Sequence, residues 1–169
     1  MKQNFFLYYI LLTVAQVLIC EWLNLSAYVT LSILPALVLC IPTKFSSTIS
    51  LFIAFATAFA VDFMAEGVMG LNMLALVPVA AAREPVIRFI FGDELLVRED
   101  GFSVKKYGIG KVIFATVIVQ ALFLAFFVFA DGSSTRPFLF NIIRFFASLV
   151  AGSAVSVFVV DLLTSEDRR

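Results

Sequence analysis

The chain has 169 residues, of which 62% are apolar or aromatic and only 14% are charged, and its mean hydropathy is +1.06. A soluble domain has about 45–50% apolar and about 25% charged residues, so water is not the main solvent of this chain. Twelve basic and twelve acidic side chains cancel, which leaves no bulk field to attract nucleic acid. The composition excludes an ordinary soluble enzyme or nucleic-acid-binding module and predicts an integral membrane protein.

Six apolar stretches approach the length that a membrane-crossing helix needs, about 20 residues. They lie at about 5–19, 25–41, 47–64, 71–82, 112–130 and 138–160. The first stretch lacks a small-x-small cleavage site, so we expect a retained span and not a signal peptide. The second contains Pro35 and ends before Pro42, and we expect the short fourth stretch to extend into the residues that follow. The sequence predicts one all-α domain over 1–169, an integral membrane bundle of six transmembrane helices.

Basic residues concentrate on one side of these spans. Ten of the twelve lie in the N-terminal segment or in segments that the six-span count places on the same side. Basic residues in short loops mark the cytoplasmic face. We therefore predict a multi-pass topology with the N-terminus and the C-terminus in the cytoplasm.

The predicted cytoplasmic segment 83–111 is the largest connection between spans. Its basic residues are Arg83, Arg88, Arg98, Lys105, Lys106 and Lys111. Apolar side chains surround Arg88 in residues 86–91, a pattern that suits the headgroup plane of a bilayer. Binding to anionic lipid, binding to a cytoplasmic partner and a plain solvated connector all remain open for this segment.

Two ionisable residues, Asp62 and Arg144, lie within predicted spans, where a charge is costly and therefore a functional candidate. At 1.5 Å per residue, Asp62 lies about 22 Å into the third span and Arg144 about 10 Å into the antiparallel sixth span. Both come to a similar depth in the outer half, so we predict an intramembrane ion pair between them or a role in assembly. The alternatives are that each charge reaches the outer interface separately, or that Asp62 caps the loop that follows it.

Polar and small residues near these charges predict close helix packing. Glu66, Gly67 and Gly70 form the outer turn after Asp62, where glycine permits a positive φ. Three amides are predicted to hydrogen-bond between helices, as is common in membranes; they are Gln16, Asn72 and Gln120. Small residues over 147–154 of the sixth span let another backbone approach closely.

The chain contains no histidine, which removes imidazole from every catalytic or metal-binding scheme. The two cysteines, Cys20 and Cys40, fall at opposite ends of neighbouring spans, so we expect neither a disulfide nor a zinc site and interpret both as packing residues. Intramembrane aspartyl chemistry would need a second aspartate beside Asp62. We predict no catalytic residue, no metal and no cofactor.

The residues from Ala60 to Leu74, AVDFMAEGVMGLNML, resemble the signature of MreD, the bacterial rod shape-determining membrane protein family. In that signature an aspartate ending one span precedes, by eight residues, a Gly-Leu pair that opens the next. Looser similarity to MreD-like chains of the Bacteroidetes covers 16–19, the proline-containing second span, 83–88 and the surroundings of Arg144. The chain departs from the common pattern at Asn72, where the family has histidine or alanine, and at Phe59 and Ala60, where it has Gly-Leu.

The resemblance implies a non-enzymatic scaffold of the elongasome in the bacterial inner membrane. Its partners would be an MreC-like single-span protein, an MreB-like filament, the RodA and penicillin-binding-protein pair, and membrane lipid. It also implies a six-helix fold similar to the substrate-binding subunits of energy-coupling-factor vitamin transporters. The alternative function is therefore a transporter subunit that binds a vitamin or another small molecule, with a pocket of outward polar and aromatic groups.

Overall fold

The structure is a computed structural model and describes residues 3–22, 29–64, 69–92, 108–132 and 137–165. Over these residues the chain is helical, as predicted, apart from its connections. The helices are α1 (Gln3–Trp22), α2 (Leu34–Leu39), α3 (Ser47–Met64), α4 (Leu71–Phe91), α7 (Ile109–Gly132) and α8 (Phe138–Ser165).

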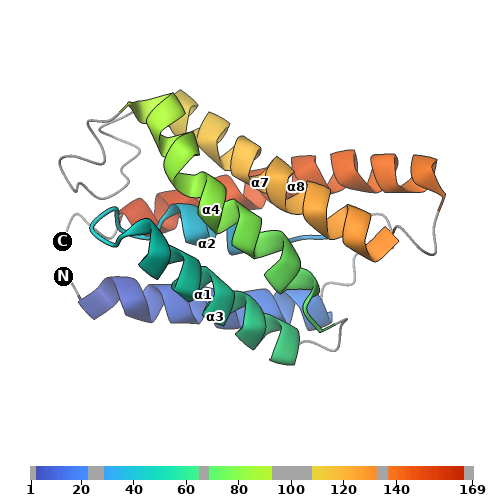
Figure 1. Ribbon diagram of the computed structural model, residues 1–169, viewed down its shortest axis with the longest axis horizontal. Coiled ribbons are helices and arrows are strands. Elements are labelled where there is room, and N and C mark those ends of the chain that lie inside the picture. The colour runs from blue at the N-terminus through green and yellow to red at the C-terminus, as the bar shows by residue number, and fades with distance from the viewer. Residues whose placement is uncertain (1–2, 23–28, 65–68, 93–107, 133–136, 166–169) are drawn as a thin grey trace.

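Successive helices run in opposite directions along the bundle (Figure 1). The start of α1, the turn between α2 and α3, the end of α4 and the end of α8 all lie at one end of the molecule (Figure 1). We call this the N-terminal end of the bundle. Because the directions alternate, the first and the last described residues lie at the same end of the bundle (Figure 1). The charge pattern likewise predicts both termini on one side of the membrane.

Within the described residues three helices are long and apolar enough to cross a membrane, over Ser47–Met64, Ile109–Gly132 and Phe138–Leu163, and a shorter apolar helix covers Phe6–Cys20. Large apolar side chains are exposed along them, including Phe52, Phe59 and Phe63 on α3. Such helices belong to a membrane-embedded protein. At 1.5 Å per residue α3, with 18 residues, is about 27 Å long, close to the hydrocarbon thickness of about 30 Å, so a membrane-spanning α3 would have its two ends near the two interfaces.

The second predicted span is not a continuous helix, which corrects the prediction of a transmembrane helix over 25–41. Among its described residues only the six of α2 are helical, and residues 29–33 are not. Pro35 occupies the first turn of α2, a position that proline favours because its missing N–H would be unpaired there anyway. Pro42 follows the last residues, where proline cannot continue a helix. We call residues 29–41 the second segment.

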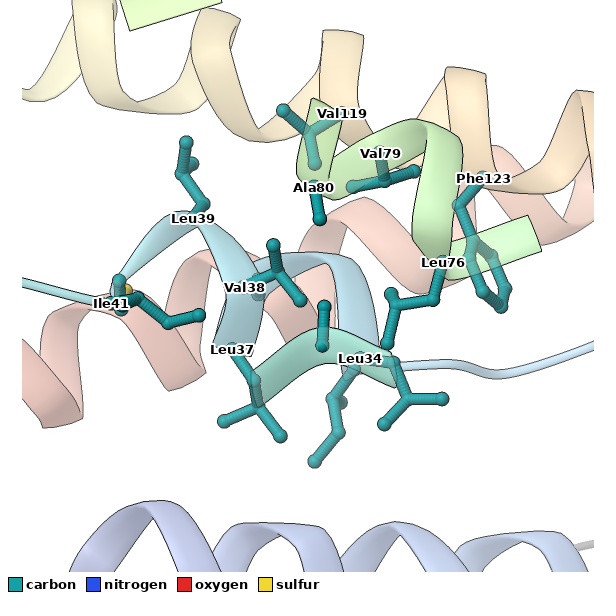
Figure 2. Close-up of a cluster of buried hydrophobic side chains, with 14 of the residues drawn as sticks. Leu34, Leu37, Val38, Leu39, Ile41, Leu76, Val79, Ala80, Val119 and Phe123 are labelled. Atoms are coloured by element: carbon teal, nitrogen blue, oxygen red, sulfur yellow. The ribbon is translucent and has the colours of Figure 1, made fainter. Parts of the chain in front are cut away.

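The second segment forms the centre of the bundle. Every side chain from Ser32 to Ile41 except that of Pro35 is among the most buried of the chain, and Pro35 itself is buried. α2 contacts each of the other five helices. Figure 2 shows Leu34, Leu37 and Val38 of α2 beside Leu76 of α4 and Phe123 of α7, all fully buried. The central part of this predicted span is therefore covered by the other helices and does not face lipid.

α4 is longer than predicted, as its short apolar stretch suggested. It continues through Pro78 and Pro85 to Phe91 and ends at Gly92, whose φ is +77°. The predicted cytoplasmic segment 83–111 is thus helical at both of its ends, since α7 begins at Ile109. Its middle, with Arg98, Lys105 and Lys106, lies outside the described residues.

Candidate functional site

The backbone of residues 30–33 is bonded by side chains from three helices. The side-chain amide of Gln16 of α1 forms two hydrogen bonds with this stretch. Its Oε1 accepts the N–H of Ile33 at 2.7 Å, and its Nε2 donates to the carbonyl of Leu31 at 3.4 Å. In a helix the Leu31 carbonyl would bond to the N–H of Pro35, which proline lacks. The amide of Gln16 supplies the missing donor.

Gln120 of α7 bonds the same stretch from the opposite side. Its Nε2 donates to the carbonyl of Ser32 at 3.2 Å, and its Oε1 accepts the hydroxyl of Ser156 at 3.3 Å. The close fit depends on Gly152 of α8, because a Cβ there would lie 2.4 Å from Gln120 Nε2. A small residue of the sixth span, Gly152, thus leaves room for a polar side chain of α7.

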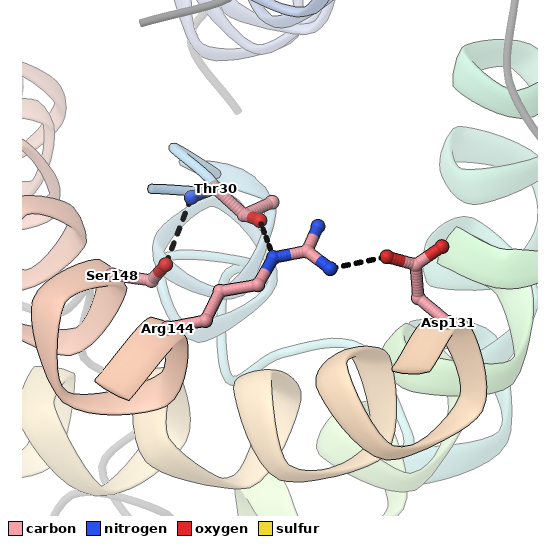
Figure 3. Close-up of polar contacts among 4 residues, drawn as sticks. All are labelled: Thr30, Asp131, Arg144 and Ser148. Carbon is pink, nitrogen blue, oxygen red and sulfur yellow. Dashed lines mark hydrogen bonds and ion pairs between the residues drawn. The ribbon is translucent and has the colours of Figure 1, made fainter. Parts of the chain in front are cut away.

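Thr30 is the point where α7 and α8 meet the second segment (Figure 3). Its N–H donates to Ser148 Oγ at 2.8 Å, and its hydroxyl accepts from Arg144 Nε at 3.1 Å. The Arg144 Nη1 forms an ion pair with Asp131 at the end of α7. Both members of the pair are largely covered, with side-chain exposures of 11% and 26%. One guanidinium therefore ties α7, α8 and the second segment together.

The predicted ion pair between Asp62 and Arg144 is wrong, because each has other partners. Asp62 caps the start of α4, which is the alternative that the sequence left open. Its Oδ2 accepts the N–H groups of Gly70 and Met73 at 3.1 and 3.2 Å, and its Oδ1 accepts the N–H and the Nδ2 of Asn72 at 3.2 and 2.8 Å. A carboxylate here satisfies N–H groups that have no partner within the helix and is favoured by the helix dipole.

Gly70 has the positive φ that was predicted for the turn after Asp62, at +92°, a value that an L side chain rarely adopts. Glu66 and Gly67 lie outside the described residues. The eight-residue spacing from Asp62 to Gly70 has a physical reason, since it brings the carboxylate at the end of α3 onto the first turn of α4.

Arg83 is not part of a solvated basic loop. It lies inside α4 with 4% exposure, and its Nε and Nη2 donate to the carbonyls of Leu39 and Ile41. These carbonyls belong to the end of α2, where a cation is favoured by the helix dipole. Arg88 does lie on the surface, in an exposed ion pair with Glu84 at 2.8 Å, and Lys111 is exposed near the start of α7.

Together these contacts form what we call the polar frame: Gln16, Gln120, Arg144, Ser148 and Arg83 around the second segment. Buried backbone groups in a bilayer must be bonded, and non-helical backbone at membrane depth occurs only inside protein or beside a water-filled cavity. Gln16, Gln120 and Arg144 are recognisable in the sequence as polar residues within apolar stretches. Thr30, Asp131 and Ser148 carry no such signal. Thr30 is a small hydroxyl residue within the predicted second span, Asp131 stands in the loop predicted after the fifth span, and Ser148 lies among small residues.

The chemistry available in the described residues is hydrogen bonding. No group of three or more Cys, Asp or Glu side chains gathers there in an arrangement that suits a metal ion. Cys20 and Cys40 form no disulfide within the described residues, and Cys20 accepts a hydrogen bond from Gln16 Nε2 at 3.1 Å. Three buried side-chain oxygens have no hydrogen-bond partner among the described residues, namely Ser32 Oγ, Ser50 Oγ and Asn141 Oδ1.

Comparison with known proteins gives no match: no family model, no curated protein and no solved structure is significantly similar to the chain.

Proposed function

We propose that the chain is a non-enzymatic membrane scaffold of MreD type. In this role it takes part in the regulation of cell shape and in lateral peptidoglycan synthesis, within the elongasome and beside an MreC-like single-span partner. An MreB-like filament and the RodA and penicillin-binding-protein pair complete the proposed assembly. The protein would reside in the bacterial inner membrane with both termini in the cytoplasm.

The observation that carries the proposal is the unit formed by Asp62, Gly70 and Asn72. Asp62 and Gly70 are signature residues on which the resemblance rests, whereas Asn72 is a position where the chain departs from the common pattern. The three are joined by hydrogen bonds of 2.8–3.2 Å at the turn from α3 to α4. A motif whose members contact one another has a reason to keep its spacing. The unit supports a structural role for the motif, since the carboxylate of Asp62 is fully occupied with capping.

A scaffold acts through its partners, so the test is co-purification. The tagged chain would be co-expressed with the MreC-like protein of the same organism and extracted in mild detergent. We expect a stable complex that resists gel filtration. Asp62→Ala would loosen the α3–α4 turn and lower the yield of complex, whereas Phe52→Leu, on the exposed face of α3, serves as the control for a neutral change. A chain that stays monodisperse alone and gains no stability with that partner would refute the proposal.

The orientation of the chain in the membrane can be measured separately with fusion proteins. A fluorescent protein fused to the C-terminus should fold and fluoresce, while an alkaline phosphatase fusion at the same place should be inactive, because the first requires the cytoplasm and the second the periplasm. The reverse result would overturn the predicted topology.

One observation favours the alternative, a transporter subunit that binds a small molecule. In transporters, interrupted helices place free backbone groups at the substrate site, and the second segment is interrupted at residues 29–33. In this chain, however, side chains of the polar frame already bond the backbone of all four residues from Thr30 to Ile33. A thermal-shift screen against a vitamin panel separates the two functions, since a ligand that binds the folded state raises its stability by mass action.

A further inference from the structure

No acidic side chain among the described residues balances the charge of Arg83. The guanidinium is 4% exposed, and its bonds go to two carbonyl oxygens, at Leu39 and Ile41. The neighbouring acid, Glu84, is paired with Arg88. Carbonyl dipoles stabilise a cation but leave its charge in place, and a buried charge is costly without a counter-ion. An arginine carries five N–H donors, and two of its three nitrogens account for the contacts seen, so Nη1 has no partner among the described residues.

The position of this cation is at a membrane interface. Its carbonyl partners come from the last residues of α2 and the residues just after it, and a turn at 42–46 follows before α3 starts at Ser47. This turn lies at the N-terminal end of the bundle (Figure 1). Because α3 alone has about the thickness of the hydrocarbon layer, the turn and the Arg83 guanidinium lie at the level where lipid headgroups begin.

The turn adds a second cation and an apolar surface. Lys44, three residues after Ile41, is exposed and forms no ion pair among the described residues. Next to it Phe45 contacts Phe6 of α1 edge to face, with ring centroids 6.2 Å apart, and Phe6 is 40% exposed. A headgroup phosphate between two cations, with an acyl chain along an aromatic surface, matches this arrangement. Arginine is well suited to phosphate because its planar fork offers paired donors.

We propose that the turn between α2 and α3, with Arg83 and Lys44, is a binding site for an anionic phospholipid of the leaflet at the N-terminal end. Arg83 Nη1 donates to the phosphate, Lys44 adds a second positive charge that attracts the anionic headgroup, and Phe6 and Phe45 line the start of an acyl chain. Under the predicted topology this is the cytoplasmic leaflet. The bound lipid also supplies the missing counter-ion of Arg83 and so stabilises the end of α2.

The test is lipid binding by the purified, delipidated full chain in detergent. Native mass spectrometry would follow titration with phosphatidylglycerol, and thermal unfolding would be recorded in parallel. We expect one phosphatidylglycerol to be retained more tightly than all others and to raise the unfolding temperature. Phosphatidylcholine, which has a phosphate but no net charge, should bind more weakly.

Three variants make the test specific. Lys44→Gln should weaken the tight phosphatidylglycerol about fivefold, the effect of one cation near a lipid surface, without touching the core. Arg83→Lys should lose the tight site while keeping the charge, and Lys111→Gln, an exposed cation elsewhere at the same end, should change nothing. Equal weakening by Lys44→Gln and Lys111→Gln would show diffuse attraction only and overturn the proposal. So would equal binding of the two lipids, or full stabilisation by water-soluble glycerol phosphate. Co-purification with an MreC-like partner is independent of each of these outcomes.

Discussion

The second segment and α7 are both apolar, yet their backbone N–H and C=O groups find hydrogen-bond partners in different ways. α7 runs through 24 residues without a proline, so its own helix satisfies its backbone and much of its surface can face lipid. The second segment has Pro35 inside it and Pro42 behind it, forms only a six-residue helix and is buried from Ser32 to Ile41. Its free backbone groups are bonded by side chains of α1, α7 and α8. Part of the information that shapes one span therefore lies in polar residues of the others.

Gln16→Leu should break this arrangement most severely. The change leaves the N–H of Ile33 and the carbonyl of Leu31 without their bonds. A buried polar group that loses its partner costs about 1–3 kcal/mol, so we expect a loss of about 2–6 kcal/mol for the two groups. The measurement is reversible unfolding in mixed micelles. Val14→Leu, on the exposed face of the same helix, is the control and should shift stability by less than about 0.5 kcal/mol; equal losses in the two variants would contradict the role of the polar frame.

Arg144 tests whether α7 and α8 are tied to the second segment by charge. Arg144→Asp opposes Asp131 in a largely covered site, and we expect a loss of about 3 kcal/mol, the low end for breaking a buried pair. Asp131→Arg with Arg144→Asp should recover much of that stability. Asp62→Arg with Arg144→Asp should recover none, because Asp62 caps α4. Rescue by the Asp62 exchange alone would contradict the contacts seen here.

Gly152→Ala probes the approach of α8 to Gln120. The added Cβ would lie 2.4 Å from Gln120 Nε2, so the amide must move and its bond to Ser32 weakens. Overpacking of this kind costs about 1–3 kcal/mol, and we expect about 2 kcal/mol. Gly110→Ala is a matched control in α7, since a Cβ there has nothing within 4 Å and alanine favours a helix. Comparable destabilisation of both variants would show that crowding at Gln120 is not the cause.

The sequence predicted much of the fold because apolar length and charge placement are strong signals. The all-helical architecture and the alternating directions follow from them, and α3 has its predicted bounds, whereas α4 continues to Phe91, well past its predicted stretch. The cap by Asp62 was only one of the alternatives that the sequence left open. The extent of α2 did not follow. Hydropathy reports burial from water, whether the cover is lipid or protein, and only Pro35 and Pro42 indicated that the helix would be short.

The partners of the charged residues were harder to predict. Depth alone placed Asp62 and Arg144 together, but depth does not specify which helices are neighbours. Asp131 stood in a predicted loop, so it was not considered as a partner for Arg144, although only residues 133–137 separate the two helices that carry them. Arg83 followed a predicted span end and counted as solvated, while the structure extends α4 past it. In both cases the missing information was the position of a helix end within one or two turns.

Ser148→Ala should have the smallest effect and the most local one. It removes the acceptor of the Thr30 N–H, a bond of 2.8 Å, and we expect a loss of about 1 kcal/mol, near the range of single hydrogen bonds in membrane proteins. Ser153→Ala is the matched control, because Ser153 is only partly buried and its hydroxyl bonds within its own helix to the carbonyl of Val150 at 3.1 Å. Hydrogen exchange distinguishes the two where global stability cannot. The Thr30 amide should exchange faster in Ser148→Ala, and α7 amides should be unchanged. Faster exchange over α7 as well would mean that Ser148 supports the whole helix pair, and the second segment would then have no separate bond to α8 at this point.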